Sequence, residues 1–270
     1  MNTAQSITAI IGVGNMGEAV LAGLLKAGHA PEAVIAGVRR RERATELAET
    51  YGVDAVDPAD AAARADVLVL GVKPYQVVDL LSGLSLRPGQ LVVSLAAGLT
   101  TASIEAAVPA GVGVVRVMPN TPSAIGEGMS AISAGTTATS EQVSLTEELL
   151  GAIGAVAVVP EAQIDAAAAL SGSGPAYVFY IAEAMIEAGV HLGLSRAVSA
   201  QLVNQTLVGS AMMLRESGEH PAVLRENVTS PGGTTAAALR VFENAALRGT
   251  LLEATRANRD RSREIARGEG

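Results

Sequence analysis

The chain has 270 residues, 49% of them hydrophobic, and a net charge of −8. This acidic balance argues against general affinity for nucleic acid or an anionic membrane surface, and the absence of cysteine excludes disulfide and thiolate chemistry. No basic segment precedes an apolar run at the N-terminus, and no apolar stretch reaches the roughly 18–20 residues of a membrane span. We therefore expect a cytoplasmic protein with one large domain or two of ordinary size.

The first half of the chain alternates apolar runs with helical patterns. The apolar runs, read as strands, are residues 6–13, 33–38, 66–72, 89–98 and 112–120. Helices are expected over residues 16–28 and 41–52, with Gly28 and Gly52 as their C-terminal stops. Because the strands are apolar throughout rather than alternating, the pattern predicts a parallel α/β sheet.

The glycine pattern GVGNMG, residues 12–17, ends the first strand and opens the first helix. In that context Gly12 makes a tight turn, Gly14 lets a pyrophosphate approach the backbone, and Gly17 lets the helix pack on the strand. A glycine-rich turn without a ligand would have the same letters. The placement between strand and helix favours a Rossmann-type dinucleotide site, with the phosphates at the helix N-terminus.

Arginines follow the second strand, where folds specific for NAD usually carry an acid. Arg39, Arg40 and Arg41 precede the first acidic residue, Glu42. Guanidinium groups suit a 2′-phosphate, so we expect NADPH as cofactor, with NADH use possible. The alternative is a solvated basic start of the following helix.

Beyond about residue 160 the strand patterns vanish and helical patterns take over. Helices are expected over residues 162–172, 175–193, 195–218, 221–227 and 250–268, and a further helix from about Thr234. Several of them carry small or apolar residues on more than one face. A domain of about 110 residues has a limited interior, so a partner subunit is expected to cover these faces as a homodimer.

Six motifs occur in an order that resembles the pyrroline-5-carboxylate reductase family. They are GVGNMGEA, GVKP at 71–74, SLAAG at 94–98, RVMPNTP at 116–122, LSGSGPAY at 170–177 and NVTSPGGTT at 227–235. The resemblance runs from about residue 7 to 255. It implies an NADP-binding Rossmann-type domain, residues 1–160, followed by an all-helical dimerisation and substrate domain, residues 161–270. In that family the active sites lie between the domains and include the partner subunit, and several dimers often assemble together.

The resemblance also assigns site residues by motif. The implied cofactor positions are Ile11, Gly12, Val13, Gly14, Asn15, Met16, Arg39, Arg40, Val72, Lys73, Pro74, Ala96, Ala97 and Asn227. The implied substrate positions are Glu161, Ser230, Gly232, Gly233, Thr234 and Thr235, with Thr235 as the catalytic residue. The chain departs from the family where many members have Asn near the helix before residues 66–72. Pro58 stands there, which leaves the contact to the adenosine ribose unassigned.

The stretch TSPGGTTAAAL, residues 229–239, fits a small cyclic imine that bears a carboxylate. The amides of Gly232 and Gly233 and the start of the next helix can receive the carboxylate, and the Thr235 hydroxyl can reach the ring nitrogen. The structural alternative is a Pro-Gly turn with a threonine N-cap. For the glycines of LSGSGPAY, the alternative to direct substrate contact is close helix packing at a dimer axis.

An imine needs less acid catalysis than a ketone, because its nitrogen can enter already protonated. The chain has only two lysines, Lys26 and Lys73, neither in the second half, and no histidine lies in a glycine- or acid-rich cluster. This pattern favours reduction of pyrroline-5-carboxylate over a hydroxyacid-type dehydrogenase, the main alternative enzyme. A dinucleotide sensor without turnover is a third possibility, and no metal site is expected.

Overall fold

A computed structural model of the chain describes residues 6–266. It divides into two compact units: residues up to Ser173 together with those from Asn258 form a sheet unit, and Gly174–Ala257 form a helical unit. No helix of the described part of the chain is both long and apolar enough to cross a membrane.

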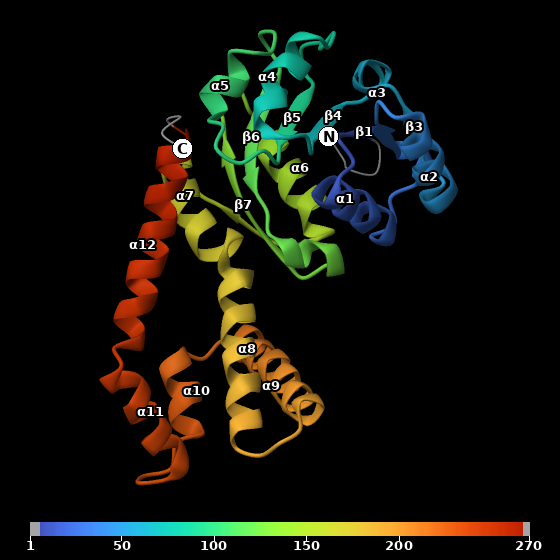
Figure 1. Ribbon diagram of the computed structural model, residues 1–270. Coiled ribbons are helices and arrows are strands. Elements are labelled where there is room, and N and C mark those ends of the chain that lie inside the picture. Colours follow the sequence, from blue (N-terminus) through green and yellow to red (C-terminus); the bar gives the residue numbers. More distant parts are fainter. Residues whose placement is uncertain (1–5, 267–270) are drawn as a thin grey trace. The chain divides into compact units, whose positions relative to one another are not determined.

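The sheet unit contains eight strands in the order β3-β2-β1-β4-β5-β6-β7-β8 (Figure 1). The strands are β1 (Thr8–Ile11), β2 (Val34–Gly37), β3 (Asp54–Val56), β4 (Val67–Leu70), β5 (Leu91–Ser94), β6 (Gly113–Met118), β7 (Gly128–Ala134) and β8 (Gly154–Val158). The first six are parallel, and Ile10 at the centre pairs with Ala36 on one side and Val69 on the other. The predicted α/β sheet is confirmed, except that β7 runs antiparallel to β6.

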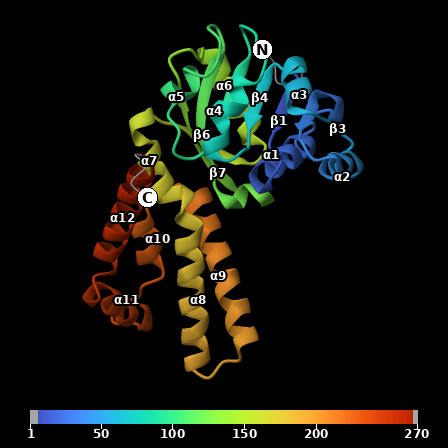
Figure 2. The same ribbon diagram turned by 45° about the horizontal axis from the view of Figure 1, so that its top comes forward.

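Helices cover both faces of this sheet (Figures 1 and 2). The helices are α1 (Asn15–Lys26), α2 (Arg41–Tyr51), α3 (Pro58–Arg64), α4 (Pro74–Ser82), α5 (Thr101–Glu105) and α6 (Ser140–Gly151). One core joins strand residues such as Ile10 to α1, α2 and α6, and the other joins residues such as Ile11 to α3, α4 and α5. Because neighbouring strand residues enter opposite cores, β1, β2, β4 and β5 are buried at every position.

The sequence correctly predicts α1 and α2 together with their stops. Gly52 caps α2 in the left-handed conformation, and Gly28 also has a positive φ just beyond α1. The elements without a counterpart in the sequence prediction include the strands β3, β7 and β8 and the helices α4, α5 and α6. Two of these strands are rich in small residues or only half-buried, so they lack the long apolar runs that identify β1 and β4.

The helical unit contains α8 (Gly174–His191), α9 (Arg196–Ser217), α10 (Pro221–Asn227), α11 (Thr234–Asn244) and the first half of α12 (Leu247–Ala266). Helices α8 and α9 form a hairpin, which is clear in Figure 2. Their bounds match the predicted helices, and Ser195 caps α9 by accepting a hydrogen bond from the Val198 amide, as expected.

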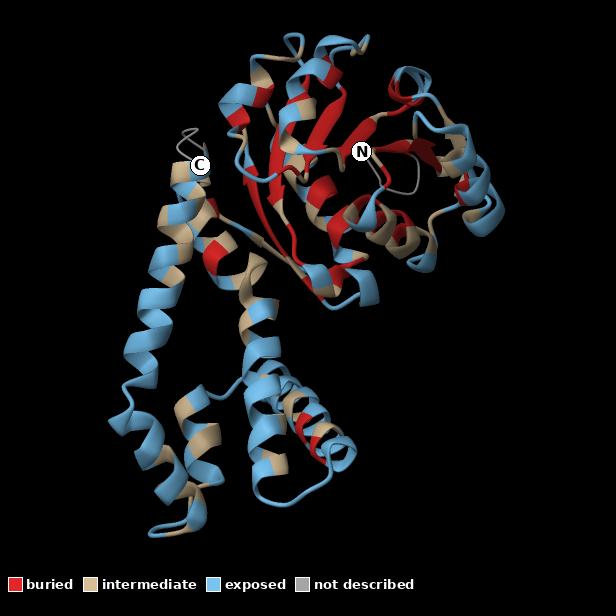
Figure 3. Cartoon of the chain, viewed as in Figure 1, coloured by how far each residue is buried: buried red, intermediate tan, exposed pale blue. Residues whose placement is uncertain are grey.

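The two units differ in burial. Within residues 174–257, all of which are described, only Ser199 and Val203 are buried, while β1, β2, β4 and β5 of the sheet unit are buried throughout (Figure 3). The predicted helix over residues 162–172 is broken into a 3-10 turn (Glu161–Gln163), α7 (Ile164–Ala167) and a π-helical turn (Ala168–Gly172). This segment belongs to the sheet unit.

Candidate cofactor and substrate sites

A cavity of about 470 Å³ lies at the carboxyl ends of β1, β2 and β4. Ligands of open α/β sheets bind at this edge. The lining residues are Ile11, Gly12, Val13, Gly14, Gly37, Val38, Arg39, Arg40, Arg43, Pro58, Gly71, Val72, Lys73, Gln76 and Leu80. Eight residues expected to bind a cofactor therefore gather around one cavity.

The glycine loop has the geometry that a nucleotide site needs. Gly12 has a φ of +87°, and a Cβ there would lie 2.5 Å from a methyl group of Val72. A Cβ on Gly17 would lie 2.5 Å from the Gly12 carbonyl oxygen, so this glycine allows α1 to pack against the loop. At Gly14, by contrast, nothing lies within 4 Å of an added Cβ. This open Cα is where a phosphate can approach the backbone.

Arg39 and Arg40 bring two free positive charges to the cavity. Both are exposed, and neither side chain makes an ion pair or a hydrogen bond within the described residues. Arg41, which begins α2, does not line the cavity. Two unpaired guanidinium groups beside the glycine loop suit a dianionic 2′-phosphate.

Arg43 also lines the cavity, and sequence reasoning missed it. Its guanidinium donates to the Val13 carbonyl at 3.3 Å and contacts Glu18 at 2.5 Å and Glu46 at 2.8 Å. In the sequence it is one more arginine in a charged helix. Only the approach of α2 to the glycine loop distinguishes it from a solvated residue.

The loop after β4 supplies the opposite wall of the cavity. Lys73 precedes α4, and its backbone amide donates to the Gln76 side chain at 3.3 Å. Pro74, which does not line the cavity, is the first residue of α4, where its missing amide costs nothing. Pro58, the departure from the family pattern, begins α3 and presents an apolar ring to the cavity.

The other expected cofactor residues do not line this cavity. Asn15 and Met16 begin α1 directly after the loop, Ala96 and Ala97 follow β5, and Asn227 ends α10 in the helical unit. Asn15 and Ala97 are exposed, whereas Ala96 is 4% exposed. Their roles remain predictions.

The SPGG segment of the helical unit forms a tight turn. The Gly233 amide donates to the Ser230 carbonyl at 3.0 Å, and Gly232 has a φ of +69°. Proline followed by such a glycine is typical of a type II turn. A Cβ on Gly233 would lie 2.4 Å from the Ser230 hydroxyl. One expectation is thereby corrected: the Gly233 amide is already used within the turn and is not available to a carboxylate.

Helix α11 begins at Thr234 without a side-chain cap. Gly233 occupies the N-cap position, so the threonine cap considered as a structural alternative is not formed. Within the described residues no hydrogen bond occupies the amides of Thr234 and Thr235 or the Thr235 hydroxyl. The helix therefore offers free donors at the positive end of its dipole.

Glu161, by contrast, is already bound on both of its carboxylate oxygens. Thr101 donates its backbone amide and its hydroxyl, and the buried Arg116 donates at 3.3 Å. Burial raises the pKa of Glu161, but the hydrogen bonds from Thr101 and Arg116 outweigh it and bring the pKa below its usual value. Asp165 lies on the other side of Arg116 at 3.7 Å.

Two of the recognised motifs meet at the carboxyl end of β6. The Asn120 side chain donates to the Ser171 carbonyl at 3.0 Å and accepts from the Met129 amide at 2.8 Å. Ser173 accepts a hydrogen bond from the Asn258 side chain at 2.9 Å. The contacts of Asn120 fasten the LSGSG segment to the edge of the sheet where ligands bind, and the contact of Ser173 joins it to α12.

Comparisons with known proteins match both parts of the chain. Residues 161–265 match the family described as pyrroline-5-carboxylate reductase dimerisation, and residues 7–98 match the family of NADP oxidoreductases that are coenzyme F420-dependent. Residues 7–98 therefore belong to an NADP-binding domain. A dimerisation domain implies a homodimer, and the helical unit leaves large side chains such as Phe179 and Tyr180 66% and 74% exposed in the single chain.

Relatives that match over nearly their whole length are also named pyrroline-5-carboxylate reductase or pyrroline carboxylate reductase. The chain is 43% identical to the pyrroline-5-carboxylate reductase of Corynebacterium melassecola, over 96% of this chain and 98% of the relative. Among solved structures, the enzyme of Coxiella burnetii has a TM-score of 0.93 at 39% identity and covers 98% of this chain and 99% of its own. The pyrroline carboxylate reductase of Plasmodium falciparum, solved with NADP bound, has a TM-score of 0.84 at 28% identity, over 98% and 100% of the two chains.

Proposed function

Because the chain belongs to the pyrroline-5-carboxylate reductase family, we propose that it reduces 1-pyrroline-5-carboxylate to L-proline, the final step of proline biosynthesis. The observation that carries this proposal is similarity over nearly the whole chain, which includes both the nucleotide and the helical regions. In the reaction a hydride adds to the imine carbon and the ring nitrogen keeps the proton with which it entered.

We propose NADPH as the preferred cofactor, with NADH as a weaker substitute. When bound, it supplies the hydride. Support comes from the cavity beside the glycine loop and from the unpaired side chains of Arg39 and Arg40. The remaining cofactor contacts that we propose are those carried over by motif: Ile11, Gly12, Val13, Gly14, Asn15, Met16, Val72, Lys73, Pro74, Ala96, Ala97 and Asn227.

On the substrate side, we propose that the start of α11 receives the carboxylate. The amides of Thr234 and Thr235 are the donors, since the Gly233 amide is occupied by its turn. The turn that contains Ser230, Gly232 and Gly233 directly precedes these amides. Because two successive residues of the turn are glycines, no side chain stands there in front of the carboxylate. The free hydroxyl of Thr235 then accepts a hydrogen bond from the protonated ring nitrogen as hydride arrives.

We propose that Glu161 acts on the substrate through its charge and not through a direct hydrogen bond. Its carboxylate is held by Thr101 and Arg116, so it is an anchored negative charge rather than a free acid. An anchored anion favours the cationic iminium form of the substrate, which is the more electrophilic form.

One assay separates this proposal from its alternatives. NADPH oxidation is followed with pyrroline-5-carboxylate, with a 2-keto acid, or with neither. Turnover with the imine alone is expected. Turnover with the keto acid alone would indicate a hydroxyacid-type dehydrogenase, and cofactor binding without turnover on any substrate would indicate a sensor.

We further propose that the homodimers assemble into a larger homo-oligomer in the cytoplasm, and that the functional boundary falls between residues 160 and 161. Support for assembly comes from the many exposed apolar side chains of the helical unit. Sedimentation at micromolar protein tests it: a species larger than a dimer is expected, and a stable monomer would contradict both the dimer and its assembly.

A further inference from the structure

We propose that Arg43 positions the nucleotide-binding loop, and so sets the affinity for NADPH and NADH alike, while Arg39 and Arg40 set the preference between them. Arg43 lines the same cavity as the other two arginines, yet its contacts are of another kind. The inference rests on the proposed function only in taking a nicotinamide dinucleotide as the ligand of this cavity.

The guanidinium of Arg43 joins three separate elements. It reaches from α2 to the Val13 carbonyl in the glycine loop, to Glu18 on α1, and to Glu46 one turn further along α2. Its side chain is 16% exposed, so most of the donors face the protein. A planar group with five donors in fixed directions can hold such a set at once, which a single ammonium cannot.

The peptide between Val13 and Gly14 is thereby held at both ends. Its carbonyl accepts from Arg43 at 3.3 Å, and its amide donates to the Gly12 carbonyl at 3.0 Å. Gly14 is the open glycine of the loop, and without a side chain its backbone is free to reorient. Fixing this peptide fixes the surface that the pyrophosphate meets, which every nicotinamide dinucleotide shares.

The charge of Arg43 is balanced inside the protein. Two carboxylates, Glu46 and Glu18, contact it, and their hydrogen bonds raise its pKa against the opposing effect of burial. Glu18 is in turn fixed by Tyr51, whose hydroxyl donates to its other oxygen at 2.9 Å. Arg39 and Arg40 make no such contacts within residues 6–266, so their charge is available to a phosphate.

Isothermal titration of the full-length chain with NADP⁺ and with NAD⁺ tests the proposal. Arg43→Met is expected to weaken the binding of both cofactors by the same factor, roughly tenfold. Arg43→Lys is expected to behave like Arg43→Met, because the charge remains but the three-way contact is lost. Arg41→Met is the matched control: it removes an arginine two residues away that does not line the cavity, and both affinities should stay unchanged.

Glu18→Gln distinguishes loop positioning by Arg43 from direct binding of the 2′-phosphate, because the two predict changes of opposite sign in the affinity for NADP⁺. It also tests the proposal if Arg43→Met does not fold. If Arg43 positions the loop, the variant weakens both cofactors. If Arg43 binds the 2′-phosphate, releasing it from Glu18 tightens NADP⁺ and leaves NAD⁺ unchanged.

Loss of NADP⁺ affinity alone in Arg43→Met, or no loss for either cofactor, would overturn the proposal. A wild-type chain that binds both cofactors but does not reduce pyrroline-5-carboxylate would refute the proposed reaction while leaving the role of Arg43 decided by the titrations. Binding of neither cofactor by the wild type would overturn both.

Discussion

Thr101 donates two hydrogen bonds to Glu161, from its backbone amide to Oε1 and from its hydroxyl to Oε2, each 2.6 Å long. The same carboxylate therefore caps the start of α5 and neutralises the buried Arg116 on β6. Glu161, which follows the last strand of the sheet, thus holds both α5 and β6 in place.

Replacing Glu161 by Gln is expected to lower the free energy of unfolding at pH 7 by about 1–2 kcal/mol, because charge-assisted hydrogen bonds are lost. The pKa of Glu161 is lowered in the folded chain, so its stabilising effect is present above the ordinary value of 4.5 and is lost as the pH falls through the lower folded value. Denaturant titrations at one protein concentration, from neutral to acidic pH, should show the gap between wild type and variant closing on the acidic side.

The control for that experiment is Glu49→Gln, which changes an exposed carboxylate on α2 with no ion pair to a described residue. It should leave stability unchanged at every pH. A gap for Glu161→Gln that persisted undiminished at acidic pH would mean that lost packing, rather than lost charge, destabilises the variant.

Thr235→Ala is expected to lower kcat/KM for pyrroline-5-carboxylate by roughly 1–3 kcal/mol of transition-state binding. Stability should not change, since within the described chain the Thr235 hydroxyl makes no hydrogen bond that could be lost. Steady-state kinetics and thermal unfolding together check this. Thr45→Ala, on the outer surface of α2, is the control. An unchanged kcat/KM would remove Thr235 from the mechanism.

The double variant Arg39→Ala/Arg40→Ala is expected to raise the KM for NADPH roughly 10- to 100-fold while changing the KM for NADH little. The reason is that only NADPH carries the 2′-phosphate, and these two guanidinium groups have no acidic partner of their own among residues 6–266. Parallel rates with the two cofactors measure the effect. Equal losses for both would show that the arginines contact the shared part of the dinucleotide.

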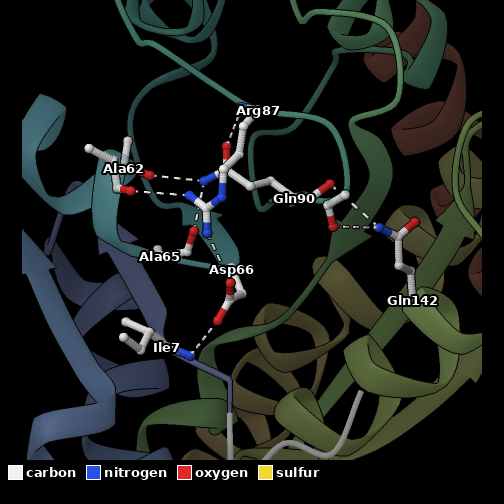
Figure 4. A network of polar contacts seen from close by, with 9 residues as sticks. Ile7, Ala62, Ala65, Asp66, Arg87, Gln90 and Gln142 are labelled. Carbon is white, nitrogen blue, oxygen red and sulfur yellow. Dashed lines mark hydrogen bonds and ion pairs between the residues drawn. The ribbon is translucent and has the colours of Figure 1, made fainter.

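Gln90→Leu is expected to destabilise the fold by roughly 2–5 kcal/mol without changing kcat. The buried Gln90 side chain donates to the carbonyls of Ala62 and Ala65 and accepts from the Arg87 amide, as Figure 4 shows. Leucine would leave these groups buried without partners, at the opposite end of β5 from the cofactor cavity.

Arg87→Met in the same network should cost less than about 1 kcal/mol, because the ion pair of Arg87 with Asp66 is half-exposed. Denaturant unfolding of both variants makes the comparison. A similar loss for the two would mean that burial of Gln90 does not decide its contribution.

The sequence predicted the elements that carry the cofactor site because their local signals agree. Strand β1 is buried at every position, the glycine pattern follows it, and Gly52 takes the left-handed conformation where α2 was expected to end. The helices α9 and α10 also carry their own boundaries, in Ser195 and Pro221.

What the sequence could not predict depends on contacts between distant segments. Strand β7 is antiparallel because of how it pairs with β6, and no local pattern encodes that direction. The role of Arg43 depends on the approach of α2 to the glycine loop, and the amide of Gly233 is seen to be occupied only once the turn is formed. Glu161 is a similar case, because its partner Thr101 lies sixty residues earlier in the chain.

The hydrogen bond between Ser173 and Asn258 has a consequence for the design of shortened variants of the protein. The chain departs for the helical unit directly after one of these residues and returns at the other, and their side chains are 2.9 Å apart. The intervening 174–257 segment is thus topologically an insert whose two cut points already touch. A chain in which a short flexible linker joins residue 173 to residue 258 is therefore the variant with which to test whether the sheet unit folds and binds a nucleotide on its own.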